Sequence, residues 1–496
     1  MSSTTSTGFC RVTVVAPDSR IDVALPDDIA LADLYPEMLR LTGQTQPTGT
    51  PVGYHFVRRD GTVLDGSRSL AAQRVLDGDV LSMRPFAASL PPVVRDDVSD
   101  AIASTVAGDH ALWNARYLRA CGLFGGALLL IFMGFVLWFA DPVKHDMHGL
   151  PGVIAGGVGL LLAVFAGVRA RVYDDRASAI ALGLAALPHV MIGGSGVLAL
   201  EAGEGVGRLQ FLLGCVAVLI VSVALVAAMP SGDAPFVAAV VLSAFGTLAT
   251  FCQIVTDTSA AGAAAVCAAV AIAAIAFLPG LSARAARLPI GYIAPRDASR
   301  NDYGASGGID LDNPSSAAAA RPVDGERIAA QVKRGHELLL GLVGGCAAVV
   351  VGSSAVLGFS DGTWAQLLAL AAGLAMLLRA RLFRYTWQVA CVLASGVISL
   401  ALLILGLALN PPASAVIDLL SGDSGPLNIR TVWLTASVAF GALILIAIAL
   451  IVPKKSVTPF WGRFGDLVEG AMLLSITPLV LAVLDVYATA RGLVSK

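Results

Sequence analysis

Hydrophobic and polar residues follow two different patterns along this chain. Near the N-terminus, apolar residues alternate with polar ones over 9–16 and 19–25, as they do in strands with one buried face. From about Gly122 onward, apolar runs of about 20 residues recur, which is the length a helix needs to cross a bilayer. The pattern therefore predicts a small water-soluble module followed by a membrane domain.

The soluble module has the order of elements of a ubiquitin-like β-grasp. After the two strands, apolar residues at helical spacing predict a helix that stops at Gly43. The stretch 54–64 is typical of a strand, an Asp-Gly turn and a short strand, and 69–85 of a helical turn, a second Asp-Gly turn and a last strand. Pro36 fits the helix if its first turn begins near Ala32, where N–H groups have no helical partner.

The apolar runs predict an α-helical polytopic membrane protein with about eleven transmembrane helices behind the β-grasp domain. Only helices satisfy every backbone polar group within one segment in lipid. The runs lie near 120–140, 150–168, 177–199, 208–229, 235–255, 259–278, 338–359, 364–378, 386–409, 432–452 and 467–489.

This reading divides the chain into five parts. Residues 1–86 form the ubiquitin-like domain, and 87–119 form a linker with an amphipathic juxtamembrane helix. Transmembrane helices one to six occupy 120–278, a cytoplasmic loop occupies 279–337, and helices seven to eleven occupy 338–490. The middle of that loop is rich in Gly, Ser, Asp and Asn, which predicts disorder or ordering by a partner.

The positive charges between the runs predict the orientation. With the N-terminus in the cytoplasm, the inner gaps hold seventeen Lys and Arg residues and the outer ones five. We therefore expect a multi-pass protein of the inner (plasma) membrane with a periplasmic C-terminus. The candidate topology and assembly residues in the inner gaps are Arg169, Arg171, Arg379, Arg381, Arg384, Lys454, Lys455 and Arg463.

Composition narrows the class of function. The chain has 496 residues, of which 56% are hydrophobic and 14% charged, and a formal net charge of -2. This composition lacks the excess of positive charge that nucleic-acid binding needs. The seven cysteines are scattered without a C-x-x-C pair, so neither a disulfide framework nor a zinc site is predicted.

Two short motifs suggest an internal duplication. GLFGG (122–126) and GLVGG (341–345) open the first and seventh runs, and RARVYDDR (169–176) and RARLFR (379–384) follow the second and eighth. Six runs separate the copies, so the repeats would be parallel. The abundance of glycine, and of arginine at inner ends, explains the same motifs without a duplication, so both interpretations remain open.

The membrane runs contain few groups that could do chemistry. No P-loop, H-E-x-x-H or G-x-S-x-G motif occurs, and we predict no catalytic residue, cofactor or metal site. Ionisable groups at membrane depth are functional candidates by default, and here they are His189, Glu469 and Asp485. Glu469 and Asp485 lie toward opposite ends of the last run, where rim or subunit contacts explain them better than a transport path.

His189 follows the helix-kinking Pro188 in the middle of a run. A proton relay would need a carboxylate at matching depth, and the sequence offers none. A histidine bonded to a backbone carbonyl that Pro188 frees is the favoured interpretation. The loop KHDMH (144–148) places two histidines at i, i+3, which commonplace loop histidines explain better than a metal site.

The ordered combination resembles EccD, the polytopic membrane component of type VII (ESX) secretion systems of mycobacteria and related actinobacteria. The matching features are the N-terminal ubiquitin-like domain, the segment DDVSDAIASTVAGDHALW (96–113) and the long loop between the sixth and seventh of eleven runs. The closing stretch PFWGRFGDLVEGAMLLSITPLVLAVLDVYATARGL (459–493) is also similar to the C-terminal end of that family.

The resemblance implies a structural subunit of a protein secretion complex. Its implied partners are EccB-, EccC- (ATPase) and EccE-like subunits, a second copy of the chain and membrane lipids. The ubiquitin-like domain would dock cytosolic parts of the ATPase, which accounts for the missing nucleotide motif. The alternative is a secondary transporter with an N-terminal regulatory domain, and a weaker third interpretation is a lipid-handling enzyme.

Overall fold

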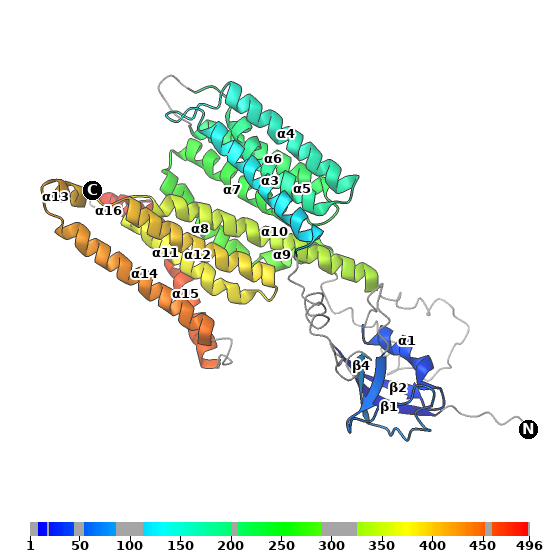
Figure 1. Cartoon of the computed structure of the whole chain (residues 1–496). Helices are drawn as coiled ribbons and strands as arrows, with labels where there is room; N and C mark the ends of the chain where they lie inside the picture. Colours follow the sequence, from blue (N-terminus) through cyan, green and yellow to red (C-terminus); the bar gives the residue numbers. More distant parts are fainter. Residues whose placement is uncertain are drawn as a thin grey trace, which may run out of the picture. The chain divides into compact units, whose positions relative to one another are not determined.

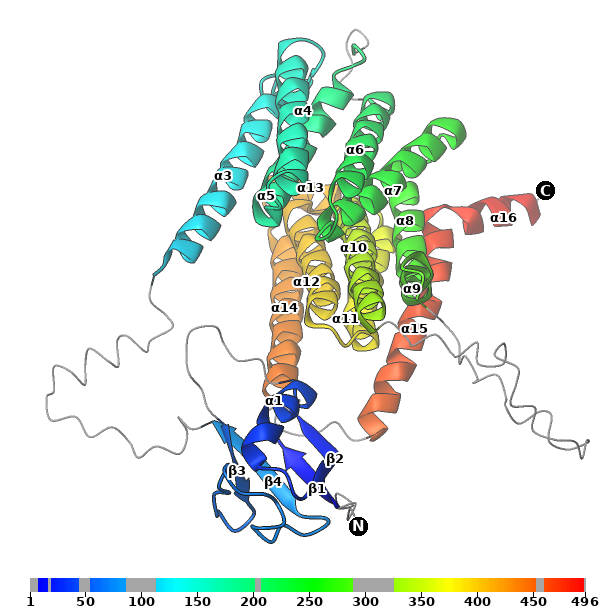
Figure 2. The ribbon, with the colours of Figure 1, turned by 90° about the vertical axis from the view of Figure 1, so that its right-hand side faces the viewer.

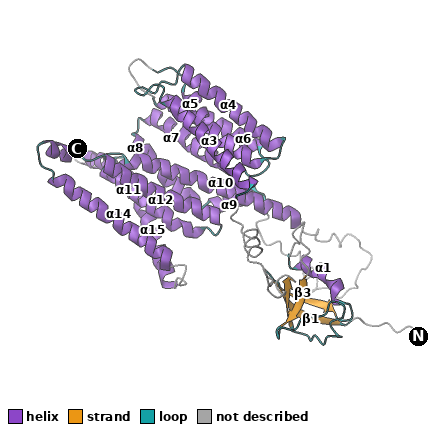
Figure 3. Cartoon of the chain, in the orientation of Figure 1, coloured by secondary structure: helices purple, strands orange, loops and turns teal. Residues whose placement is uncertain are grey.

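The computed structural model describes residues 8–16, 19–43, 54–85, 113–200, 207–288, 325–451 and 459–494. The chain divides into two compact units, Met1–Trp113 and Asn114–Lys496. Among the described residues, strands occur in the first unit and long helices in the second (Figure 3). The expected juxtamembrane helix and the Gly/Ser-rich part of the 279–337 loop lie outside the described residues.

The first unit is a four-stranded sheet with one helix. Its elements are β1 (Phe9–Val15), β2 (Arg20–Pro26), α1 (Leu31–Leu41), β3 (Tyr54–Arg58) and β4 (Val80–Pro85). The strand order is β2-β1-β4-β3, with β1 and β4 parallel and the other pairs antiparallel. This arrangement confirms the β-grasp prediction, although the predicted strand after the Asp-Gly turn is reduced to a single bridge between Val57 and Val63.

Alternation along β1 builds the core of this unit. Val12 and Val14 are buried, while Arg11 is exposed and Thr13 is only partly buried, because successive side chains of a strand point to opposite faces. They share one apolar cluster with Leu31 and Met38 of α1. A shift of β1 by one residue would turn Val12 and Val14 to the other face of the sheet, so burial fixes the register.

Helix α1 departs from the sequence expectation at Pro36. The helix begins at Leu31, so Pro36 lies in its second turn instead of the first. A proline there leaves the carbonyl of Ala32 without its helical donor. The structure accommodates this because the start of the helix is held from outside, where Leu31 and Ala32 donate to the carbonyls of Arg68 and Gly66.

The second unit is a bundle of apolar helices. Among the described residues, ten helices are long and apolar enough to cross a membrane, and α8 with α9 forms a pair, bent by 64°, that makes up to eleven. This agrees with the predicted number of spans. In chain order the helices are α3 (Ala115–Trp138), α4 (Leu150–Arg171), α5 (Arg176–Ser195), α6 (Arg208–Ala228), α7 (Ala234–Thr256), α8 (Ala260–Ile275), α9 (Leu278–Ala285), α10 (Gly325–Gly358), α11 (Thr363–Arg379), α12 (Thr386–Leu409), α13 (Ala413–Leu420), α14 (Gly425–Ile451), α15 (Pro459–Val483) and α16 (Val486–Val494).

Short polar side chains and prolines mark where these helices start. Asn114, Asp175 and Ser259 precede α3, α5 and α8, and each accepts a hydrogen bond from a backbone N–H of the first turn. Prolines occupy the first turns of α4, α7 and α9, where a missing N–H does no harm. The helix boundaries therefore follow local sequence signals.

The helices form two groups, which Figures 1 and 2 show from two sides. The N-terminal group is α3–α7, and the C-terminal group contains α10, α11, α12 and α15. Helix α8 precedes the long loop but packs with the C-terminal group, where Ile272 and Ile275 are buried among residues of α10 and α11. The division in space thus falls one helix earlier than the division in sequence.

Within each group, glycines let helix backbones approach closely. A Cβ atom placed on Gly193 of α5 would lie 2.5 Å from the Cα of Gly156 on α4 and 2.7 Å from its nitrogen. Gly406 of α12 meets the carbonyl group of Gly358 on α10 in the same way. Small residues favour helix association in lipid because the close contact gains van der Waals energy.

The two groups meet where α7 packs on α10. Gly341 and Gly345 of the GLVGG motif pack against valines of α7, whereas a Cβ on Gly122 of the GLFGG motif in α3 would meet no atom within 4 Å. Arg334 of α10 donates to both carboxylate oxygens of Asp233 at the start of α7, at 2.6 and 2.8 Å. Glycine contact and a buried ion pair therefore hold the junction, and the duplication stays a prediction.

Helix α14 is the exception to this packing. None of its residues is buried, although it is 27 residues long and almost wholly apolar. It lies at the edge of the bundle (Figure 1), and its Arg430 donates to the carbonyl of Asn410, just after the end of α12. An apolar surface of this length, exposed along its whole course, indicates contact with lipid or with another protein.

We expect Gly193→Ala to destabilise the membrane unit, because the new methyl group overlaps the backbone of α4. Overpacking of this kind costs roughly 1–3 kcal/mol. The matched control is Gly441→Ala in α14, where a Cβ meets no atom within 4 Å. Denaturant unfolding of the purified protein in detergent measures both variants, and equal stability of the two would contradict the close approach of α4 and α5.

Removal of the Arg334 side chain should lower the free energy of unfolding far more than the loss of an exposed ion pair does. Arg334→Ala leaves the fully buried Asp233 carboxylate without its partner, for which about 3–5 kcal/mol is expected. Arg208→Ala breaks an ion pair with the exposed Asp257, for which less than about 1 kcal/mol is expected. The same unfolding experiment compares them, and similar small losses would show that the junction does not depend on this ion pair.

Candidate functional site at the charged helix ends and an apolar cavity

His189 of α5 is fully buried inside the N-terminal group. Its Nδ1 lies 2.9 Å from the carbonyl oxygen of Ala185, so this nitrogen carries the proton and donates. The carbonyl that Pro188 frees is that of Leu184, one residue earlier, so the favoured interpretation was right about the kind of partner and wrong about which carbonyl. The Nε2 atom has no hydrogen-bond partner and points toward Gly134 of α3.

The predicted basic residues gather at one end of the helices. We call this the Arg-rich end, defined by Arg169, Arg171, Arg379, Arg381 and Arg384, where α4 and α11 finish. In the N-terminal group, Arg169 pairs with Asp175, and Arg119 of α3 donates to the same carboxylate at 2.5 Å. Two guanidinium groups from different helices therefore share the residue that caps α5.

Asp175 is held in its charged form by this arrangement. Its hydrogen bond with Ser178, together with the guanidinium groups, lowers the pKa of the carboxyl from its usual 3.8 to about 2. Arg171 acts differently, since it donates to the carbonyls of Ala227 and Ala228 at 2.6 and 2.7 Å. A cation at the C-terminal end of α6 satisfies carbonyl groups that have no helical donor.

The C-terminal group has its own charged cluster at the Arg-rich end. Arg381 donates to Asp466 at 3.0 Å and to Glu469 at 3.3 Å, both on α15. Arg379 is buried, and its Nε has no hydrogen-bond partner. Glu469 thus lies in an ion-pair cluster that links α11 to α15, which agrees with a contact role. Arg384 and Arg463 are exposed, and Lys454 and Lys455 lie outside the described residues.

The KHDMH histidines have structural partners. Nδ1 of His145 lies 3.0 Å from the carbonyl oxygen of Trp138, and Nδ1 of His148 lies 3.0 Å from that of Gly196. In the part of the chain that the structure describes, no three His, Cys, Asp or Glu side chains are grouped as metal ligands. These bonds fix the loop between α3 and α4.

Asp485 lies at the break between α15 and α16. Its backbone has a φ of 54°, and its carbonyl accepts a hydrogen bond from the backbone N–H of Thr489. It lines a cavity of about 620 Å³ between α11, α15 and α16, together with Trp364 and Arg491. Sequence reasoning placed Asp485 inside the last span, whereas the helix turns at that position.

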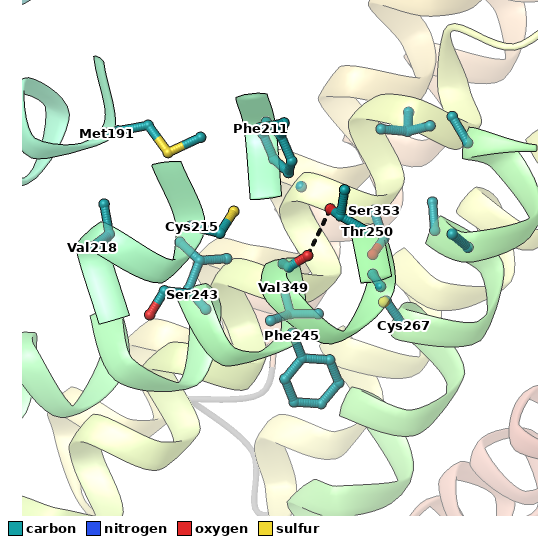
Figure 4. Close-up of a pocket in the computed structure, with 18 of the residues that line it drawn as sticks. Met191, Phe211, Cys215, Val218, Ser243, Phe245, Thr250, Cys267, Val349 and Ser353 are labelled. Carbon is teal, nitrogen blue, oxygen red and sulfur yellow. Dashed lines mark hydrogen bonds between the residues drawn. The ribbon is translucent and has the colours of Figure 1, made fainter. Parts of the chain in front are cut away.

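A cavity of about 860 Å³ opens at the seam between the two helix groups. Its walls come from α5, α6 and α7 on one side and from α8 and α10 on the other (Figure 4). Most of the side chains that face it are apolar, including Phe211, Val218 and Val349, and Arg208 lies at one end. Sequence analysis missed this cavity because its lining is spread over five helices.

The arrangement offers binding surfaces and no reaction centre among the described residues. The charged groups are paired at helix ends, and the cavity contains no nucleophile with an adjacent base. Such a site can hold apolar chains or contact other membrane helices.

Solved structures share this fold. The structure of protomer 1 of the ESX-3 core complex matches 97% of this chain and 100% of its own, with 19% identity and a TM-score of 0.56. The MycP5-free ESX-5 inner membrane complex in State II matches 88% of this chain and 99% of its own, with 22% identity and a TM-score of 0.51. At these identities the matches establish the fold alone.

Sequence comparisons match each unit separately. The ESX-4 secretion system protein eccD4 of Mycobacterium tuberculosis, in strains CDC 1551 / Oshkosh and ATCC 25618 / H37Rv, is 26% identical over 276 residues, or 49% of this chain. The match spans 58% of the length of these curated relatives. Residues 9–83 match the family described as WXG100 protein secretion system (Wss), protein YukD. Residues 118–493, three quarters of the chain, match the family of the EccD-like transmembrane domain, and the chain therefore belongs to that family.

Proposed function

We propose that this protein is a structural membrane subunit of a type VII (ESX) protein secretion complex. The observation that carries the proposal is the pairing of two units in one chain, since both match families of this secretion system. The absence of a reaction centre among the described residues is consistent with a subunit that builds a frame. We infer that energy comes from an EccC-like ATPase and that the chain itself is not an enzyme.

The ubiquitin-like domain is the proposed docking site for the ATPase. Phe9 and Leu76 are large apolar side chains that are 64% and 68% exposed. They belong to one end of the domain, because the backbone N–H of Arg11 donates to the carboxylate of Asp77 at 2.6 Å and holds that loop beside β1. Exposed aromatic and aliphatic side chains of this kind serve as anchors in protein interfaces.

The open apolar helices are the proposed contacts within the membrane. Helix α14 buries no residue, and the GLFGG face of α3 has no neighbour at Gly122. A second copy of the chain, EccB- and EccE-like subunits and membrane lipids are the proposed occupants of these surfaces. The Arg-rich end would face the cytoplasm under the positive-inside rule, with the C-terminus in the periplasm.

The secondary transporter remains the alternative. Its support is the number of spans and the buried His189, which lies at membrane depth with an unpartnered Nε2. Against it, the Nδ1 of His189 is occupied by a carbonyl of its own helix. A proton-coupled carrier needs a path of titratable groups, whereas Ser195, six residues further along α5, does not titrate and donates to the carbonyl of Ile192 in its own helix.

Deletion of residues 1–85 should leave membrane insertion intact and weaken recovery of the EccC-like ATPase in detergent pull-downs. The sharper variant is the double substitution Phe9→Ser and Leu76→Ser, which removes two exposed anchors without touching the buried core. Each hot-spot side chain is expected to contribute about 2 kcal/mol, or roughly a 30-fold loss of affinity.

The matched control is Leu41→Ser, which changes an apolar residue with 44% exposure at the end of α1. It should recover as much ATPase as the unchanged protein. Undiminished recovery with both the deletion and the double variant would contradict the docking role.

A further inference from the structure

The seam cavity extends through about two thirds of the membrane depth from one end of the helices. Its lining on α6 runs from Arg208 at the first residue of that helix to Val218, and on α10 it lies between Val349 and Val356 near the last residue. Ten residues of helix rise about 15 Å, which is half of a hydrocarbon core of about 30 Å. On α7 the lining runs from Ala239 to Gln253, a rise of about 21 Å, so the cavity opens at one membrane surface and ends before the other.

Two hydroxyl groups in the wall of the cavity already have hydrogen-bond partners. The hydroxyl of Ser243 donates to the carbonyl of Ala239 at 2.6 Å, and the hydroxyl of Thr250 donates to that of Gly246 at 2.7 Å. Both bonds stay within α7. Apart from Arg208, Gln253 and Ser353, the other side chains that line the space are aliphatic, aromatic or sulfur-containing, so an apolar chain is the occupant that fits.

The mouth of the cavity carries one charge of each sign. Arg208 donates to the carboxylate of Asp257 at 2.7 Å and to the carbonyl of Gln253 at 3.1 Å. Both side chains are accessible, with exposed fractions of 47% for Arg208 and 89% for Asp257. An exposed pair of this kind is weak, so its members are available to a ligand with complementary charges.

The volume decides between a lipid and a protein helix. A transmembrane helix 10 Å across and 30 Å long fills roughly 2,400 Å³. The cavity of about 860 Å³ holds about a third of that, and it does not cross the whole depth. Its size instead lies within the range of about 300–1,000 Å³ that is usual for small-molecule ligands.

From these features we propose that the cavity binds one zwitterionic glycerophospholipid with an ethanolamine headgroup. Its acyl chains lie between α5, α6, α7, α8 and α10, its phosphate pairs with Arg208 and its ammonium group pairs with Asp257. The lipid fills the seam between the two helix groups, which protein atoms leave open. The site lies within one chain and does not depend on the proposed secretion function.

Gly352 offers a direct way to block the site. It lines the cavity on α10, and a Cβ placed on it meets no atom within 4 Å, so Gly352→Phe directs a ring into the space without backbone overlap. The matched control is Gly441→Phe on α14, which is equally open and lies outside the cavity. Thermal unfolding in detergent establishes that both variants fold.

The experiment measures the lipid that stays with the full chain after purification in mild detergent, by native mass spectrometry and lipid extraction. The unchanged protein and Gly441→Phe should retain phosphatidylethanolamine at about one molecule per chain. Gly352→Phe should retain at least about tenfold less, because displacing two buried methylenes already removes about 1.6 kcal/mol. The proposal would be overturned if both variants retained equal amounts of the lipid. It would also be overturned if the unchanged protein carried only detergent and no phospholipid.

A second arm tests recognition of the headgroup. Delipidated protein is offered vesicles with equal amounts of phosphatidylethanolamine and phosphatidylglycerol, and the bound lipid is identified. Asp257→Asn removes the partner of the ammonium group and should shift binding toward phosphatidylglycerol, whereas Arg208→Gln should weaken binding of both lipids. An unchanged preference in both variants would refute headgroup pairing at the mouth.

Discussion

Close approach of helix backbones is the constraint on which the membrane unit depends. Lipid tails are as apolar as leucine, so burying apolar surface between helices gains little in a bilayer. Packing must come from contacts too close for a side chain, such as Gly193 on Gly156 and Gly406 on Gly358. Such contacts join α4 to α5 in one group and α10 to α12 in the other, whereas Gly441 of α14 meets no atom within 4 Å.

The apolar helix faces could pack against one another in many ways, and charged side chains determine which helices join. Arg334 and Asp233 lock α10 onto α7, and Arg381 joins α11 to α15 through Asp466 and Glu469. Each pair has one member at a helix end, with Asp233 just before α7 and Arg381 just after α11. The interior between the two groups is left uncharged and incompletely filled, which is why a cavity remains at the seam.

Length and periodicity were enough to predict the eleven spans and the β-grasp, because both are local properties of the chain. They were not enough to predict that α8 packs with the C-terminal group or that Arg334 pairs with a residue 101 positions earlier. Of the candidate site residues, Arg169, Arg171, Arg381 and Glu469 were found by charge and position, but their partners were not. The cavity left no sequence signal, since each helix contributes only a few ordinary apolar residues to it.

The central claim is that this chain works as a fixed part of a larger membrane assembly. Native mass spectrometry of the tagged protein, extracted from its own membrane in mild detergent, tests it most directly. The account predicts an assembly that contains more than one copy of the chain together with an ATPase subunit and further membrane subunits. A single chain or an isolated dimer that alone moves a solute across liposome membranes would contradict it.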